Sequence, residues 1–299
     1  MVYPIVEVPE GSANQLEQLG TKSKFWYTDN SDRRMLFKIG RLNAGENWAE
    51  KVACEICTLL QLPHAHYEFA KHRNQSGVVS ETFVPKGARL ILGNELLGHI
   101  YTGYDKKITY KSSQYTVRRV MAVIENTDIN LPINCNRKDL ENAADVFVGY
   151  LMLDALISNQ DRHHENWGLI VTEKGLYLAP TYDHASSLGR NETDENRRNR
   201  LQTRDIGYSV ESYVKRAKSA LYKSPTSNKP LTTMDAFREA AKIKPDAYKY
   251  WLSVLEKIDL PSYSEIFAQI PEKLISQFGT QFALKILELN TVRLLEGNN

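Results

Sequence analysis

The stretch from Asp154 to Asp183 constrains the chain most strongly, because it joins three kinds of segment in a fixed order. An apolar run ends near Ile157, and a loop rich in ligating side chains follows it, reading Ser-Asn-Gln-Asp-Arg-His-His-Glu-Asn over residues 158–166. Two short apolar runs, at residues 168–171 and 175–178, then lead to a second carboxylate at Asp183. This pattern predicts one hairpin that returns Asp183 to the polar loop.

The polar loop and the later carboxylate carry side chains suited to one chemistry. Asp161 and Asn166 are five residues apart, which is the Asp-x-x-x-x-Asn spacing of the protein-kinase catalytic loop. Asp161 could orient or accept the proton of an attacking hydroxyl, while Asn166 and Asp183 offer the oxygen ligands that Mg²⁺ prefers. Either loop residue alone would more often cap a turn. The set as a whole predicts metal-dependent phosphoryl transfer.

A lysine in an apolar strand is the expected cation of such a site. Lys38 follows Met35-Leu-Phe, and a buried ammonium there requires a partner. Glu50 lies 12 residues later, at the start of a predicted helix, and an ion pair with it would place Lys38 on the α- and β-phosphates of a nucleotide. Glu55 competes on the same helix, but it lies further round the helix, so we expect Glu50 to be the partner.

A short segment near the N-terminus is the candidate phosphate-covering loop. It reads Gly20-Thr21-Lys22-Ser23, and its backbone N–H groups and lysine could hold phosphate oxygens. The segment has neither a Walker A pattern nor Gly-x-Gly-x-x-Gly, and a single glycine is usually only a turn residue.

The adjacent histidines of the polar loop permit a second interpretation. His163 and His164, with Asp161 and Glu165, could bind a transition metal for nuclease or hydrolase chemistry. Neighbouring residues rarely point at one ion, however, so one histidine is expected to hydrogen-bond the loop backbone and hold Asp161 in place. Asp154 is expected to do the same, with simple surface exposure as the alternative.

Composition excludes several other classes of protein. The net charge of +2 gives no support for direct nucleic-acid binding. The N-terminus shows no Sec-type signal, and the apolar run at residues 146–157 is too short to span a bilayer. Three cysteines without a framework indicate a reducing compartment, so we expect a cytoplasmic protein with no membrane partner. Cys54 and Cys57 form a single Cys-x-x-Cys inside a helical pattern, which favours buried helix residues over metal ligands.

The periodicity of apolar residues predicts an α+β chain with two lobes. Strand patterns occur at residues 3–8, 35–39, 65–70 and 77–84, with one helix at residues 48–62 that ends before Pro63. This β-rich N-lobe is expected to comprise residues 1–92. A helical C-lobe is expected over residues 93–299.

Helical patterns dominate the second half of the chain. Asp139 is the candidate N-cap of a long helix that runs to about Ile157. Other helices are expected at residues 115–125, 206–222, 234–242, 247–257, 263–270 and 281–295, most of them separated by prolines. Residues 190–204 are expected to form a polar, charged loop.

Several of these motifs resemble one known family. The run Asp154-Ala-Leu-Ile-Ser-Asn-Gln-Asp-Arg-His-His-Glu-Asn166 resembles the catalytic loop of HipA-like serine/threonine kinases, and Tyr182-Asp-His-Ala-Ser-Ser-Leu-Gly189 resembles their metal-binding segment. Leu36-Phe-Lys38 with Trp48-Ala-Glu-Lys51 is similar to the ATP lysine and its helix. Gly93-Asn-Glu-Leu-Leu97 is similar to a segment after the hinge in short members.

The resemblance implies a bilobed, protein-kinase-like fold and a set of roles. Asp161 would be the catalytic base, Asn166 and Asp183 the Mg²⁺ ligands, and Lys38 the ATP lysine. The hinge would lie at residues 81–84, where backbone groups near Glu81 and Phe83 would hold adenine.

The resemblance also implies partners and regulation. Its substrates would be protein serine or threonine hydroxyls, and autophosphorylation in the phosphate-covering loop would fall on Ser23, with Thr21 second. An antitoxin is an implied partner, although short members also act alone or as secreted effectors. A lipid or small-molecule kinase of the same fold, or a nucleotide-binding pseudokinase, are the alternatives.

Overall fold

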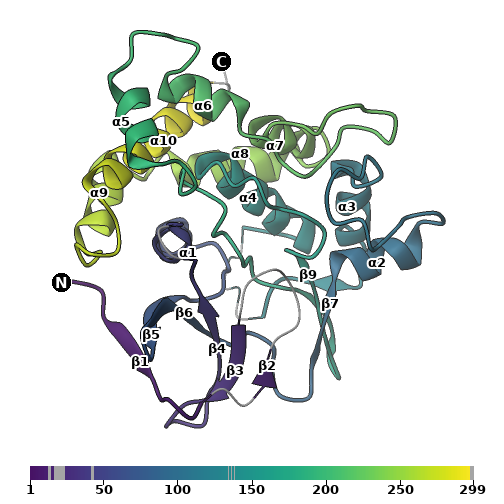
Figure 1. Cartoon of the computed structure of the whole chain (residues 1–299). Helices are drawn as coiled ribbons and strands as arrows, with labels where there is room; N and C mark the ends of the chain where they lie inside the picture. Colours follow the sequence, from purple (N-terminus) through teal and green to yellow (C-terminus); the bar gives the residue numbers. More distant parts are fainter. Residues whose placement is uncertain are drawn as a thin grey trace.

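A six-stranded sheet forms most of the N-terminal part of the protein (Figure 1). The structure, a computed structural model, describes residues 1–12, 15–16, 24–41, 44–133, 135, 137 and 139–296. The strand order is β1-β5-β6-β4-β3-β2, in which β1 and β5 run parallel and the other neighbours antiparallel. The strands are β1 (Ile5–Val8), β2 (Gln15–Leu16), β3 (Lys24–Thr28), β4 (Arg34–Ile39), β5 (Glu68–His72) and β6 (Gln75–Glu81).

Helix α1 (Glu46–Leu60) packs on this sheet through β5 and β6. Its apolar residues recur at helical spacing, and most of them are buried, which confirms the helix expected at residues 48–62. The helix ends at Gln61, which has a left-handed φ of 50° and donates its N–H to carbonyls of the last turn. Another side of α1 contacts α9 (Leu260–Ala268), so the helix lies between the sheet and the C-terminal part.

A second, four-stranded sheet carries the predicted hairpin. Strands β9 (Gly168–Thr172) and β10 (Gly175–Leu178) pair antiparallel, which confirms the two short apolar runs as a hairpin. Two strands not expected from the sequence flank them, β7 (Arg89–Leu92) and β8 (Ile129–Asn130), in the order β7-β9-β10-β8. Because β7 belongs to this sheet, the chain enters it before residue 92. The lobe boundary after residue 92 stays a prediction.

Helix α4 (Ala143–Leu156) is the central element of the C-terminal part. All of its residues are buried, and it contacts α3, α7, α8 and α10. The prediction of Asp139 as its N-cap is wrong. Asn142 caps the helix, because its side chain accepts the Asp145 N–H while the Asp145 carboxylate accepts the Asn142 N–H.

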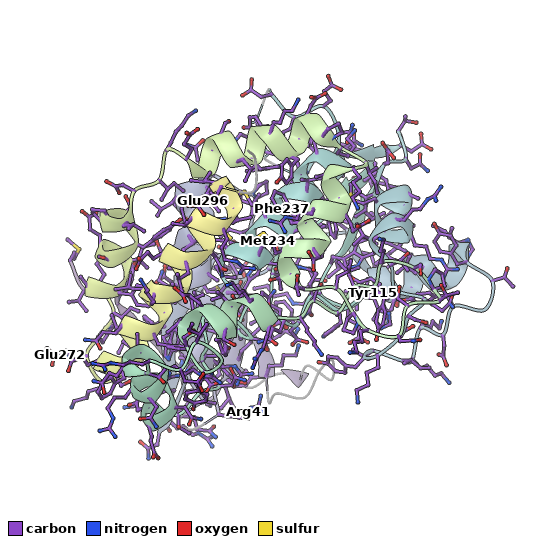
Figure 2. The ribbon with its side chains drawn as sticks, turned by 90° about the horizontal axis from the view of Figure 1, so that it is seen from above. Arg41, Tyr115, Met234, Phe237, Glu272 and Glu296 are labelled. Atoms are coloured by element: carbon purple, nitrogen blue, oxygen red, sulfur yellow. The ribbon has the colours of Figure 1, made fainter. Side chains whose placement is uncertain are left out.

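The remaining helices pack on α4 or on its neighbours, and Figure 2, seen from above, shows α10 running from the side of Glu272 to Glu296. They are α2 (Gly93–Ile100), α3 (Val117–Ile124), α5 (Asp194–Gln202), α6 (Val210–Arg216), α7 (Thr233–Ala241), α8 (Pro245–Leu255) and α10 (Gln277–Glu296). None of the helices in the described part of the chain has the length and apolar character needed to cross a bilayer.

Two predictions for this region need correction. Residues 190–204 are not all loop, because α5 forms within them, capped by the Thr193 side chain on the Asn196 N–H. The helix expected at residues 206–222 is shorter, since the chain leaves α6 after Arg216 and becomes extended. Lys218 and Tyr222 then form isolated bridges with Thr232 and Thr116. The α+β architecture itself, with a β-rich N-terminal part and a helical C-terminal part, is confirmed.

The cap of α4 gives a stability prediction. Asn142→Ala leaves the Asp145 N–H without its acceptor, and we expect the free energy of unfolding to fall by about 0.5–2 kcal/mol. Urea denaturation followed by circular dichroism measures this loss. Asp139→Ala is the matched control and should change the value by less than about 0.5 kcal/mol. An equal loss in both variants would contradict the assignment of the cap.

Candidate active site

Lys38 on β4 brings together three separate segments of the chain. It is 7% exposed, and its Nζ lies 3.5 Å from Asp183 Oδ1 and 3.6 Å from Glu50 Oε2. It also donates to the Tyr67 hydroxyl at 3.1 Å. Burial lowers the pKa of Lys38, but the charges of Asp183 and Glu50 raise it by more, so the amine stays protonated.

Glu50 is fixed on its other side by the segment that carries Asp183. It is 1% exposed, and its Oε1 accepts the backbone N–H of His184 at 2.7 Å. The competing carboxylate, Glu55, lies 2.7 Å from Lys51 Nζ. The structure therefore brings Lys38 together with Glu50 and places Glu55 beside a different lysine.

A buried ion pair holds the polar loop after α4. Arg162 is fully buried, and its Nε and Nη2 donate to the two carboxylate oxygens of Asp154, each at 2.8 Å. Its Nη1 donates to the Asn166 carbonyl at 2.8 Å, so the guanidinium ties the end of α4 to the end of the loop. Asn159 donates to Asp154 at 2.8 Å and accepts the Asp161 N–H at 3.2 Å. Asp154 is thus a buried support of Asp161, and surface exposure is excluded.

Both carboxylate oxygens of Asp161 accept hydrogen bonds from side-chain hydroxyl groups. The Tyr110 hydroxyl donates to Oδ1 at 3.0 Å, and the Ser186 hydroxyl donates to Oδ2 at 3.3 Å. Ser186 lies three residues after Asp183, so the segment that carries Asp183 also contacts Asp161.

The donor set of the expected metal ligands suits Mg²⁺. The Nδ2–H of Asn166 donates to the Asp161 carbonyl at 2.6 Å. The amide oxygen then points to the other side of the group and can bind a metal ion. Asp183 offers carboxylate oxygens and has a left-handed φ of 60°, a strained conformation for a non-glycine residue. Carboxylate and amide oxygens are ligands that Mg²⁺ accepts, and the residues fit this ion.

The two histidines of the loop face different partners. His163 accepts the Glu165 N–H on Nδ1 at 3.2 Å, and its Nε2 lies 3.8 Å from Asp161 Oδ1. His164 Nδ1 lies 2.6 Å from the Tyr104 hydroxyl. Burial, followed by the charge of His163, lowers the pKa of His164 to about 4. Among the described residues, these two histidines do not belong to a group of three or more ligand atoms close enough to hold one metal ion.

The expected nucleotide contacts are described only in part. Strand β6 ends at Glu81, whose carboxylate lies 3.6 Å from Arg33. The Phe83 ring stacks on Tyr182, next to Asp183, with centroids 5.3 Å apart. Contacts of these residues with adenine stay a prediction. Gly20, Thr21, Lys22 and Ser23, the expected phosphate-covering loop, lie outside the described residues.

Sequence reasoning missed four residues that shape the site. The sequence contains a signal for Arg162, because this charged residue follows Asp161 and stands eight positions after Asp154 in the apolar helix. An ion pair between Arg162 and Asp154 could have been predicted from it. Tyr67, Tyr110 and Ser186 offered none, because each reaches the site from a segment whose position depends on the tertiary fold.

The fold is similar to those of two solved proteins. The chain matches the Helicobacter pylori proinflammatory kinase CtkA with a TM-score of 0.73 at 19% identity, covering 98% of this chain and 99% of that one. It also matches a chain of the Shewanella oneidensis MR-1 toxin–antitoxin complex of HipA, HipB and operator DNA. There the TM-score is 0.58 at 11% identity, with coverage of 94% of this chain and 65% of that one. These likenesses show that the fold is kinase-like and bilobed.

The sequence comparisons identify the family. None of the curated proteins compared with the chain matches its sequence. Residues 18–244 match the HipA-like C-terminal domain, a region that includes Lys38, Glu50, Asp161, Asn166 and Asp183. The resemblance seen in the sequence motifs is confirmed, and the chain belongs to the family of HipA-like C-terminal domains.

Proposed function

We propose that this protein is an ATP- and Mg²⁺-dependent kinase that transfers the γ-phosphoryl group to a serine or threonine hydroxyl of a protein. The family and the kinase-like fold support a kinase. The observation that carries the proposal is the position of Lys38, whose Nζ lies within 3.6 Å of both Glu50 and Asp183, while Ser186 of the Asp183 segment donates to Asp161. A cation, a metal-ligating carboxylate and a base are the parts that phosphoryl transfer requires.

The residues divide the work by charge. Lys38, held protonated by two carboxylates, binds the oxygens of the non-transferred phosphates. Asn166 and Asp183 would hold Mg²⁺, and the bound ion would neutralise phosphate charge. Asp161 accepts the hydrogen bond of the attacking hydroxyl and takes its proton as the phosphoryl group arrives. The Asp154–Arg162 pair keeps the loop in place during these steps.

The contacts of Asp161 support a hydroxyl acceptor. Tyr110 and Ser186 both offer O–H donors to its carboxylate, and an acceptor hydroxyl has the same donor chemistry. Tyr110 is exposed and lies in the segment between α2 and α3, so an acceptor can take its place at Oδ1. A side chain with a free hydroxyl, such as serine or threonine, fits this position.

Partner and regulation follow from the family as further proposals. The Shewanella oneidensis structure contains HipA together with HipB, and an antitoxin partner for this chain is proposed on that ground. Autophosphorylation of Ser23 is proposed from the sequence resemblance.

The base assignment predicts a selective loss of rate. Asp161→Asn keeps the shape of the side chain but removes its basicity, so phosphoryl transfer should fall by about 10²- to 10⁴-fold, roughly 3–5 kcal/mol. The assay is incubation with labelled ATP and Mg²⁺, with and without cell lysate, followed by mass spectrometry of every labelled protein, lipid and metabolite. Full transfer by the variant would refute the role of Asp161, and label on lipids or metabolites alone would refute a protein acceptor.

The metal assignment predicts a different defect at Asp183. Asp183→Asn should abolish Mg²⁺-dependent nucleotide binding, whereas Asp161→Asn should leave that binding nearly unchanged, because Asp183 is assigned to the metal and Asp161 is not. Titration calorimetry with ATP, with and without Mg²⁺, measures both. Glu55→Gln is the control, since Glu55 pairs with Lys51 outside the site. If Mg²⁺-dependent nucleotide binding persisted in Asp183→Asn, the assignment of Asp183 as a Mg²⁺ ligand would be wrong.

Mass spectrometry of the intact protein tests the proposed autophosphorylation of Ser23. Protein incubated with ATP and Mg²⁺ should gain one phosphate that Ser23→Ala lacks and Thr21→Ala retains. Peptide mapping then locates the group. A phosphate found only outside residues 20–24 would exclude Ser23.

A further inference from the structure

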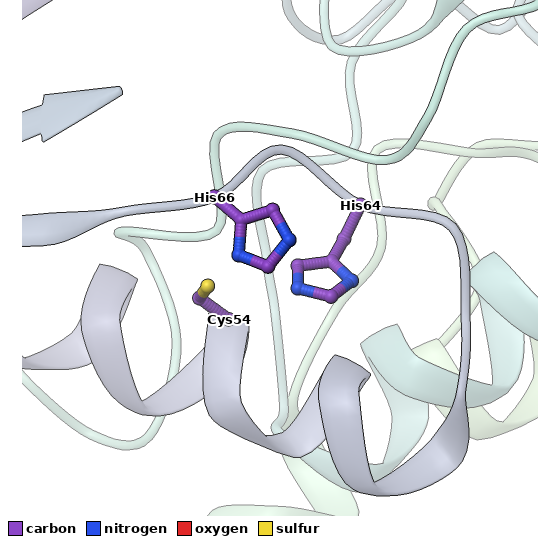
Figure 3. Close-up of side chains that lie close together, drawn as sticks. All are labelled: Cys54, His64 and His66. Atoms are coloured by element: carbon purple, nitrogen blue, oxygen red, sulfur yellow. The ribbon is translucent and has the colours of Figure 1, made fainter. Parts of the chain in front are cut away.

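A cysteine and two histidines converge outside the proposed active site. The Cys54 thiol and one ring nitrogen each from His64 and His66 lie within 4.8 Å of one another. Cys54 comes from α1, and the histidines come from the connection between α1 and β5. Figure 3 shows the two imidazole rings side by side above α1, next to the cysteine sulfur. We propose that these three residues bind Zn²⁺, with the fourth ligand position left to solvent.

The donor chemistry selects the metal. One thiolate and two imidazoles are ligands for Zn²⁺ and similar transition metals, whereas Mg²⁺ and Ca²⁺ require oxygen ligands. Tetrahedral bonds of about 2.3 Å to sulfur and 2.0–2.1 Å to nitrogen place ligand atoms roughly 3.3–3.6 Å apart. The three atoms therefore need to close by at most about 1.5 Å, and because His66 is exposed, its ring can turn toward the other two ligands.

His64 is already oriented as a ligand. Its Nδ1 lies 2.7 Å from the Leu62 carbonyl, so Nδ1 carries the proton and Nε2 carries the lone pair. Metal-binding histidines commonly donate their other ring N–H to a backbone carbonyl in this way. Thr58 Oγ1, 3.3 Å from Nε2, can donate its single proton to the Cys54 carbonyl at 3.2 Å, which leaves the lone pair of Nε2 available.

The surroundings of Cys54 influence a bound thiolate in two opposing ways. The Tyr67 N–H donates to its sulfur at 3.4 Å, and a backbone donor of this kind stabilises negative charge on sulfur. Burial raises the pKa of the thiol to about 12, so a metal ion must displace a proton when it binds. Cys57, the other residue of the Cys-x-x-Cys, is fully buried and is not part of this cluster.

The position of the cluster gives the ion a structural role. Between the two histidines, the Ala65 N–H donates to the Thr181 carbonyl at 2.9 Å, and the Thr181 N–H donates to the Pro63 carbonyl at 3.0 Å. Thr181 lies two residues before Asp183, and Cys54 lies one turn after Glu50 on α1. A metal ion at this point would fasten the helix of Glu50 to the connection that holds the Asp183 segment.

Titration of the whole chain with cobalt tests the site. The reduced protein is titrated with Co²⁺, and thiolate-to-cobalt charge-transfer absorption reports the Cys54 ligand directly. We expect one Co²⁺ per chain, displaced by one Zn²⁺. Cys54→Ala should lose the band, and His66→Gln should bind at least about 10-fold more weakly. Cys135→Ser and His99→Gln, both outside the cluster, are the controls and should match the wild type.

Each outcome is decisive for the proposal. Absence of the thiolate band in the wild type, or its persistence in Cys54→Ala, would overturn the site. A band lost in Cys135→Ser would assign the metal elsewhere. Because His66 is exposed, His66→Gln is expected to fold even if the buried Cys54 variant does not, and unchanged affinity in His66→Gln would also overturn the site. The readout does not depend on kinase activity.

Discussion

The buried pair of Asp154 and Arg162 is the interaction on which the rest of the site depends. Arg162 is fully buried, and two of its nitrogens bind one carboxylate while the third binds the Asn166 carbonyl. A buried charge that loses its partner costs several kcal/mol, so the end of α4 and the loop that follows it hold one another in position. Asn159 links this pair to Asp161, because it donates to Asp154 and accepts the backbone N–H of Asp161.

Lys38 is the second point at which distant segments meet. The sheet supplies the lysine, α1 supplies Glu50, and the chain after β10 supplies Asp183. One buried cation between two carboxylates is stable only when all three segments are in place, because desolvation otherwise outweighs the attraction. The arrangement of the site therefore depends on the packing of α1 against both the sheet and the C-terminal part.

The sequence predicted the elements whose signal is local. Apolar periodicity identified α1 and the β9–β10 hairpin, and the loop spacing identified Asp161 and Asn166 as candidates. Asp139 was mistaken for the cap of α4 because Asn142 and Asp145 form a capping box only once the helix start is known. Helix α5 was missed because its sequence is almost entirely polar, so no apolar stripe marks it. Tyr110 and Ser186 reach Asp161 across 51 and 25 residues, and no local pattern encodes such contacts.

The two hydroxyl donors on Asp161 have a consequence for the choice of acceptor. In the proposed reaction, an incoming hydroxyl replaces the phenol of Tyr110 and exchanges one hydrogen bond for another of the same kind. Such an exchange contributes little net binding free energy. The reacting group is therefore a poor basis for selection, and recognition has to come from parts of the acceptor that lie away from the phosphorylated residue. Under the proposed function, substrate proteins would then be distinguished by their surfaces, and the hydroxyl would need only to lie at the correct place beside Asp161.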